Sequence, residues 1–169
     1  MNDSKIKPIL KSAHKNDLSE IAALYKSAIG QQGCTWSADY PTEDDMHNDF
    51  ESNCLFSLYL GEKLIGAVSV EPKNELDDIK IWKISDGTHR EIARVVISKE
   101  YQGMGYSKTM LSQLFELLSY GGYKSIHLLV CVDNVAAIKL YRSLGFEFID
   151  ECYRYGHDFY VCEKILNIF

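Results

Sequence analysis

Residues 95–110 have the sequence VVISKEYQGMGYSKTM, and this stretch decides which fold the chain can form. An apolar segment typical of a β-strand passes through a loop with Gly103 and Gly105 and continues directly into a helical pattern. The first turn of a helix leaves N–H groups unpaired, and glycines let the main chain approach an anion closely. The stretch therefore indicates a phosphate-binding strand–loop–helix unit, although glycines at such a junction also serve as ordinary turn residues.

The loop differs from the two best-known nucleotide-binding loops. It lacks the G-K-[ST] ending of a Walker A loop and the G-x-G-x-x-G spacing of a dinucleotide fingerprint. A nucleotide-phosphate binder is therefore disfavoured.

The segments on either side of this unit predict an α/β (α+β) fold with a mixed, mostly antiparallel central sheet flanked by helices. Gly121-Gly122 separates the helix after the loop from the apolar strand SIHLLVCV, and these segments form one parallel crossover. Helices are expected at 17–29, 42–50, 108–120 and 134–144. Strands are expected at 5–13, 55–60, 64–70, 78–85, 90–98, 125–132, 146–150 and 158–166.

Helix ends have recognisable signals. Asp17 with Glu20 forms a candidate capping box, Thr42 is a candidate N-cap, and Gly145 follows the last helix in the C′ position.

Length and composition set further limits. The 169 residues are 46% hydrophobic and 25% charged, which predicts a single domain over residues 1–169. The net charge of −6 disfavours nucleic acid and anionic membrane as partners. Five cysteines without a C-x-x-C pair favour reduced thiols and a cytoplasmic location. We expect no metal site and no membrane span, because the required ligand spacing and long apolar run are missing.

A second motif, NVAAIKLYRSLGF at 134–146, follows the glycine loop about thirty residues on. Together the two motifs resemble the GNAT superfamily of N-acetyltransferases. Gln102 and Gly105 match the family pattern Q/R-x-x-G-x-G/A, and Ser107 replaces its last small residue. The family block N-x-x-A-x-x-L-Y-x-x-x-G-F is matched by Asn134, Ala137, Leu140, Tyr141, Gly145 and Phe146.

The resemblance implies that the two central strands, 90–98 and 125–132, splay apart and hold acetyl-CoA between them. Pantetheine amides would pair with the main chain of the first strand, as an added strand does. The pyrophosphate would bind the N–H groups of the glycine loop. The cofactor-binding residues implied are Val95, Val96, Ile97, Gln102, Gly103, Met104, Gly105, Tyr106, Ser107, Asn134, Ala137 and Tyr141.

Acetyl transfer from a thioester to an amine needs a neutral amine, a stabilised oxyanion and a protonated leaving thiolate. The resemblance implies Tyr141 as the general acid, because the family's tyrosine at this position lies near the thioester sulfur. The alternative is that its ring only packs beneath the cofactor. A main-chain N–H near Val96 or Ile97 is a candidate oxyanion donor.

Glu91 is the candidate general base, since family members with a strand-borne catalytic glutamate carry it at the same offset, eleven positions before Gln102. The alternatives are a solvated strand-end acid, a water chain that deprotonates the amine, and the weaker candidates Asp44, Asp45, Glu100 and His89.

Acceptor selectivity is expected from the aromatic loop GCTWSADYP at 33–41. Trp36 and Tyr40 either form a wall for the acceptor amine by cation–π contact or anchor the loop on the core. We expect a small-molecule amine. A protein amine remains an alternative acceptor, and a non-catalytic acyl-CoA-binding module is the alternative function. The apolar tail Ile165, Leu166, Ile168 and Phe169 leaves a homodimer seam open.

Overall fold

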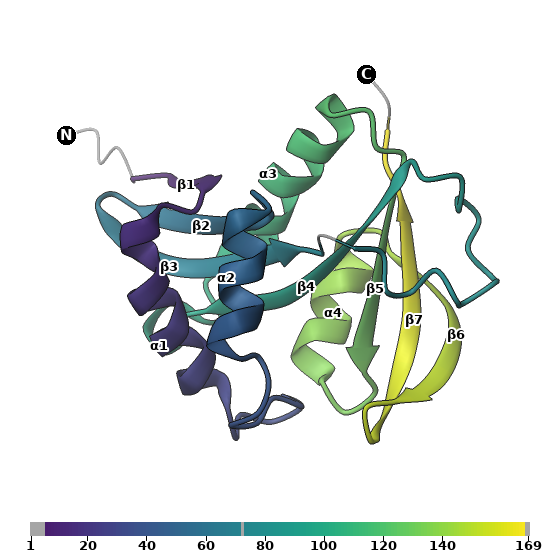
Figure 1. The fold of residues 1–169 in the computed structure, drawn as a ribbon, viewed down its shortest axis with the longest axis horizontal. Helices are drawn as coiled ribbons and strands as arrows, with labels where there is room; N and C mark the ends of the chain where they lie inside the picture. The colour runs from purple at the N-terminus through teal and green to yellow at the C-terminus, as the bar shows by residue number, and fades with distance from the viewer. Residues whose placement is uncertain (1–5, 72, 168–169) are drawn as a thin grey trace.

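The computed structural model describes residues 6–71 and 73–167, which form a sheet covered by helices on both faces (Figure 1). The strands are β1 Pro8–Ser12, β2 Leu55–Leu60, β3 Lys63–Val70, β4 His89–Ile97, β5 Ser125–Cys131, β6 Glu147–Arg154 and β7 His157–Ile165. The helices are α1 Leu18–Ala28, α2 Glu43–Glu51, α3 Tyr106–Tyr120 and α4 Val135–Ser143. Within these residues the sheet order is β1-β2-β3-β4-β5-β7-β6, with β4 and β5 parallel and the other neighbours antiparallel. The predicted fold class is confirmed.

The two central strands separate along their length, as expected. β4 and β5 pair only through His89–Glu91 and Ser125–His127, and the described residues add no further pair between them. β5 nevertheless pairs with β7 as far as Cys131, and β4 pairs with β3 as far as Ile97. Each strand therefore remains anchored on its outer side while an opening forms between them.

A bulge in β4 changes which residues face each layer. Ile92 and Ile97 both belong to the core cluster beneath α3 and α4, although an odd number of positions separates them. The register against β3 shifts at this point, and Arg94 adopts a φ of 50°. The extra residue restores Ile97 to the α3 face, while Val96 packs in the second cluster with α1 and α2.

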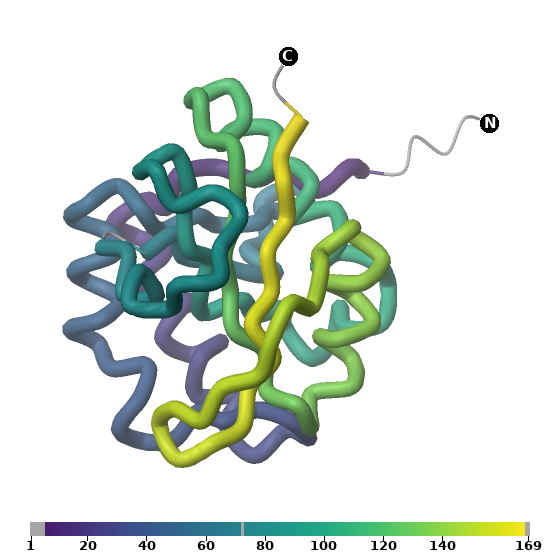
Figure 2. The backbone as a smooth tube through the Cα atoms, turned by 90° about the vertical axis from the view of Figure 1, so that its right-hand side faces the viewer, coloured from purple at the N-terminus to yellow at the C-terminus, as the bar shows by residue number. Residues whose placement is uncertain are grey.

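The segment 78–85 was predicted as a strand, and that prediction is wrong. It belongs to an irregular connection between β3 and β4, described at residues 71 and 73–88, which lies beside β5 and β7 (Figure 2). Its alternation arises because Trp82 is buried against Leu76 and Val161 while Ile81 is exposed. The main-chain N–H groups of Lys83 and Ile84 donate to the carboxylate of Glu163 on β7, at 2.8 and 3.1 Å, instead of to a neighbouring strand.

The predicted helix caps hold at two ends and fail at one. Thr42 caps α2 by accepting from Asp45 N at 3.1 Å, and Gly145 has a φ of 83° after α4. Asp17 does not cap α1. It is buried and accepts from His14 N and from the hydroxyls of Ser57 and Tyr59, because β2 supplies better donors than the first turn.

The ends of the chain differ from the sequence expectation only slightly. β1 begins at Pro8 within the predicted strand 5–13, whose first residue lies outside the described residues. Of the apolar tail, Leu166 is buried in the core and Ile165 is 43% exposed. Ile168 and Phe169 lie outside the described residues.

Candidate active site

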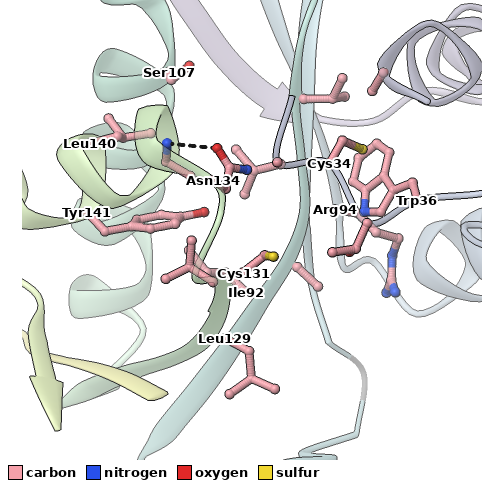
Figure 3. Close-up of a pocket in the computed structure, with 18 of the residues that line it drawn as sticks. Cys34, Trp36, Ile92, Arg94, Ser107, Leu129, Cys131, Asn134, Leu140 and Tyr141 are labelled. Atoms are coloured by element: carbon pink, nitrogen blue, oxygen red, sulfur yellow. Dashed lines mark hydrogen bonds between the residues drawn. The ribbon is translucent and has the colours of Figure 1, made fainter. Parts of the chain in front are cut away.

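A cleft of about 1420 Å³ opens where β4 and β5 diverge. Figure 3 shows Asn134 and Tyr141 on the side of α4, and Cys34, Trp36 and Arg94 on the opposite side. The β3–β4 connection contributes further lining residues, which include Glu71 and Glu75. The cleft therefore reaches from the glycine loop at the start of α3 to the loop between α1 and α2.

One end of the cleft is formed by the glycine loop, which has the features of an anion cradle. Gly105 is the N-cap of α3 with a φ of 83°, and it supplies no side-chain cap for the first turn. A Cβ built on Gly103 or Gly105 would meet no atom within 4 Å, so both face open space. The Gln102 amide donates to Ile97 O at 3.0 Å, which ties the loop to the end of β4. Free N–H groups, the positive helix end and open space together fit a diphosphate.

Most of the expected cofactor-binding residues line this cleft. They are Val95, Val96, Ile97, Gln102, Gly103, Gly105, Ser107, Asn134, Ala137 and Tyr141. Met104 and Tyr106 are not among the lining residues. Met104 is 63% exposed, and the Tyr106 ring packs on Tyr101 at a centroid distance of 6.0 Å. These two positions can contribute main-chain atoms to the loop without presenting their side chains to a ligand.

Asn134 has a structural task of its own. Its Oδ1 accepts from Ala137 N at 3.1 Å and so caps α4. The remaining Nδ2 group is a donor, so any ligand contact by this side chain must go to an acceptor such as an amide oxygen.

Tyr141 lies on α4 with its hydroxyl directed into the cleft (Figure 3). Its ring packs edge-on against Phe146 at 5.4 Å, which fixes the ring orientation. Burial raises the pKa of Tyr141 above its usual range, with a smaller contribution from Cys162. The phenol therefore keeps its proton at neutral pH and is available as a donor.

Glu91 lies on β4 at the point where β4 and β5 separate, and it lines the cleft while being only 1% exposed. Its carboxylate accepts from the main-chain N–H groups of Glu75, at 2.6 Å, and of Leu76. Burial raises the pKa of Glu91 to about 7, against these two hydrogen bonds, which lower it. A carboxyl with a pKa near neutrality is suited to accept a proton, and it also anchors the β3–β4 connection.

Trp36 and Tyr40 both line the opposite wall, as the sequence suggested. Trp36 packs edge-on against Tyr25 of α1 at 5.4 Å, so it anchors its loop as well as facing the cleft. The Tyr40 hydroxyl accepts from Arg94 Nη1 at 3.0 Å. The positions of Trp36 and Tyr40 are therefore compatible with both expected roles, as a wall of the cleft and as anchors of the loop.

A buried ion-pair group in this wall was not anticipated. Arg94 is paired with Asp49 of α2 through two 2.8 Å hydrogen bonds and with Glu71 at 2.9 Å. Arg94 and Asp49 side chains are 5% and 2% exposed. Removing one partner of such a pair costs about 3–5 kcal/mol, because it leaves a buried charge uncompensated. The signal in the sequence was a single arginine within the apolar run ARVVIS.

The loop after α1 crosses to the far side of the cleft. A Cβ on Gly33 would lie 2.4 Å from Asn134 Cα, so only glycine permits this approach. Gln102 Nε2 also donates to Gln31 Oε1 at 3.2 Å. The loop thus touches both the α4 N-cap and the glycine loop, on either side of the opening.

The described residues lack two other kinds of feature. Among them, no group of three or more His, Cys, Asp or Glu side chains is arranged to hold a metal ion. No helix in this part of the chain is long and apolar enough to cross a membrane.

Comparison with known families assigns the fold and cleft to a class. Residues 18–146 match the model of the acetyltransferase (GNAT) family, and the chain belongs to this family. The family uses acetyl-CoA, which agrees with an open glycine loop beside two splayed strands.

Two curated relatives share parts of the sequence. The N-acetylaspartate synthetase of Xenopus tropicalis is 26% identical over 73% of this chain and 42% of its own length. A probable spermine N(1)-acetyltransferase of Bacillus subtilis subsp. natto is 41% identical over 34% of this chain and 39% of its own length. The chain thus matches less than half the length of these curated relatives.

Solved structures share the fold over nearly the whole chain. A GNAT-family acetyltransferase from Streptococcus agalactiae has a TM-score of 0.81 at 20% identity and covers 95% of this chain and 96% of its own. An acetyltransferase from Salmonella typhimurium, solved with its cofactor acetyl-CoA, has a TM-score of 0.74 at 20% identity and covers 95% of both chains.

Proposed function

We propose that this chain transfers an acetyl group directly from acetyl-CoA to a primary amine of a small molecule. One observation carries the proposal: the diphosphate cradle at Gly105, the Tyr141 hydroxyl and the buried Glu91 carboxylate line one continuous cleft. Main-chain groups of β4 beyond Glu91 lack a β5 partner among the described residues, so they are available to pair with pantetheine amides.

The reaction assigns a separate task to each group. Glu91 takes a proton from the acceptor ammonium, directly or through a water, since its pKa of about 7 allows it to be ionised at neutral pH. The amine nitrogen then attacks the thioester carbonyl carbon, and a main-chain N–H near Val96 or Ile97 donates to the oxyanion. The C–S bond breaks, and Tyr141 donates its proton to the leaving thiolate. The proton that the attacking nitrogen still carries then passes to Tyr141, directly or through water, which leaves a neutral amide, CoA thiol and the phenol. A phenol of raised pKa makes complete proton transfer less favourable than an ordinary phenol would, so hydrogen bonding to the sulfur carries more of the effect.

The competing function is an acyl-CoA-binding module without catalysis. A module of that kind needs the cradle but needs neither a hydroxyl directed into the cleft nor a buried carboxylate of neutral pKa beside it. The presence of both favours catalysis. A protein amine, such as an N-terminus or a lysine, remains the alternative acceptor.

Two measurements on the purified protein test the proposal. Calorimetric titration with acetyl-CoA is expected to give saturable binding, and a panel of primary amines is expected to release CoA thiol in the presence of acetyl-CoA. Binding of acetyl-CoA with no thiol release above hydrolysis, for small amines and peptides alike, would favour the non-catalytic module.

A further inference from the structure

The acceptor end of the cleft carries mostly negative charge. Five carboxylates line it, from Asp45, Asp49, Glu71, Glu75 and Glu91, against the cations Arg94 and Lys73. Two other lysines that line the cleft, Lys108 and Lys139, belong to α3 and α4 on the cradle side. The charges are therefore sorted along the cleft, with the cations of the helices near the cradle and the carboxylates near the acceptor wall.

Arg94 is not free to bind an anionic acceptor. A guanidinium has five N–H donors. Nε and Nη2 of Arg94 donate to the Asp49 carboxylate, Nη2 also pairs with Glu71, and Nη1 donates to the Tyr40 hydroxyl. These contacts leave at most one N–H among the described residues, whereas a clamp on a carboxylate needs two parallel N–H groups. The buried guanidinium is thus neutralised by the protein itself.

The reacting nitrogen cannot balance the negative charge of the remaining carboxylates. It must lose its proton before it attacks the thioester, so its positive charge is absent when the transfer occurs. Glu71 and Glu75 lie on the β3–β4 connection, and Glu71 is mostly buried, with 17% of its side chain exposed. Burial raises the pKa of Glu71 against the neighbouring Arg94 charge, so a second cation nearby would stabilise its ionised form.

Aromatic rings complete the wall. Trp36 and Tyr40 line the same end of the cleft as these carboxylates. Carboxylates combined with an aromatic face suit an alkylammonium group, because the ring quadrupole attracts a cation that is partly removed from water.

We propose that the acceptor is an aliphatic diamine or polyamine, in which a second ammonium group is held by Glu71, Glu75 and the Trp36–Tyr40 wall while the first amine is acetylated beside Glu91. This inference rests on the proposed function and adds the substrate class. The second ammonium remains charged throughout the transfer and is the group that the acidic wall recognises.

The test compares four acceptors: 1,4-diaminobutane, n-butylamine and 4-aminobutanoate, which share a four-carbon chain, and spermidine, which extends the diamine by an aminopropyl unit. Thiol release gives kcat/KM for each, and titration gives the affinity of each for the protein saturated with CoA. The diamine and spermidine are expected to exceed butylamine at least 10-fold, mainly through KM, and 4-aminobutanoate is expected to be the poorest. Because the preference is electrostatic, it should shrink when the ionic strength is raised. Equal use of butylamine and spermidine, or a preference for 4-aminobutanoate or a lysine peptide, would overturn the inference.

Single substitutions test which carboxylates cause the preference for spermidine over butylamine. Glu75→Gln, at an exposed position, is expected to reduce the advantage of spermidine over butylamine several-fold without altering acetyl-CoA affinity. Glu71→Gln is expected to do the same, with additional loss of stability from the Arg94 pair. Glu62→Gln, an exposed acid in the β2–β3 turn away from the cleft, is the matched control and should leave the advantage unchanged. If the advantage of spermidine over butylamine is unchanged in both Glu75→Gln and Glu71→Gln, the placement of the second ammonium group at these carboxylates is contradicted.

The two proposals fail in different ways. If acetyl-CoA binds but no amine gives thiol release, the proposed transfer is wrong, and the affinity of spermidine relative to butylamine still decides the inference about the wall. If butylamine and spermidine are acetylated with equal kcat/KM, the transfer stands and the inference fails.

Discussion

At the scale of single residues, the sharpest chemical predictions concern Tyr141 and Glu91. The fold holds these two side chains to different degrees. Tyr141→Phe removes only the hydroxyl, since the ring stays packed against Phe146. We expect kcat to fall about 10²-fold, the lower end of the range for a lost general acid, with acetyl-CoA affinity within a few-fold. Steady-state thiol release and calorimetry measure the two quantities. Unchanged turnover would remove Tyr141 from the mechanism.

Glu91 is expected to set the pH dependence of the reaction. Its pKa of about 7 means that the base form is lost as the pH falls below neutrality, so kcat/KM should rise through pH 7 and then level. Glu91→Gln should abolish this limb and lower kcat by about 10²–10⁴-fold.

A matched control separates this chemistry from loop anchoring. Glu163 also accepts two main-chain N–H groups of the β3–β4 connection, from Lys83 and Ile84, but it does not line the cleft. Glu163→Gln should therefore leave the pH–rate profile in place. A profile that moves equally in both variants would indicate that anchoring, and not proton transfer, explains the effect of Glu91→Gln.

At the scale of elements, the glycine loop before α3 is the part whose conformation matters most. Gly105 has a φ of 83°, where a β-branched residue is strained, and its missing Cβ faces open space. Gly105→Val is expected to weaken acetyl-CoA binding at least 100-fold. Gly61→Val is the matched control, because Gly61 has a φ of 64° and equally open space in the β2–β3 turn, away from the cleft. Affinity lost equally in both variants would contradict the cradle.

Two buried carboxylates, those of Glu91 and Glu163, hold the β3–β4 connection in place of strand pairing. Burial alone would raise the pKa of Glu163, but hydrogen bonds from Lys83, Ile84 and Ser125 outweigh it and leave the pKa below the usual value. Its contribution to stability is therefore complete above pH 4.5, the ordinary glutamate value, and is lost as the pH falls below it. Glu163→Gln should lower the free energy of unfolding by about 1–3 kcal/mol at pH 7 and reduce this acid sensitivity, as urea titrations at several pH values would measure. A variant as stable as the parent at pH 7 would show that the anchor is dispensable.

This connection also marks the limit of what the sequence could predict. The glycine loop, the α4 motif and the strands beside them were predictable, because each depends on local pattern and on residues close in sequence. Asp78–Ser85 has the alternation of a strand, yet its N–H partners come from Glu163, about 80 positions away. Likewise Asp17 resembles an N-cap until Ser57 and Tyr59 compete for its carboxylate.

The candidate site was predictable to a similar degree. Tyr141, Asn134 and the loop glycines carried a recognisable pattern, and Glu91 a recognisable offset. The role of Arg94 was not predictable, because it depends on ion pairs with Asp49 and Glu71, which lie on other elements.

At the scale of the whole molecule, acetyl-CoA should stabilise the fold. A ligand present at 100 times its Kd adds about 2.7 kcal/mol to the free energy of unfolding. For a domain of this size each kcal/mol raises Tm by about 2–4 °C, so a shift of roughly 5–11 °C is expected. Thermal unfolding with and without acetyl-CoA measures the shift, and Gly105→Val should lose it. No shift at saturating acetyl-CoA would argue against binding in the native state.

The short contact between β4 and β5 has a consequence for how the sheet exchanges with solvent. Amides in the middle of a sheet are normally the slowest to exchange hydrogen for deuterium, since both sides of the strand are paired. On β4, protection on the β5 side ends at Glu91. The central strand should therefore label quickly along its inner edge, as an outer strand would, until an extended molecule occupies the gap and completes the row of hydrogen bonds.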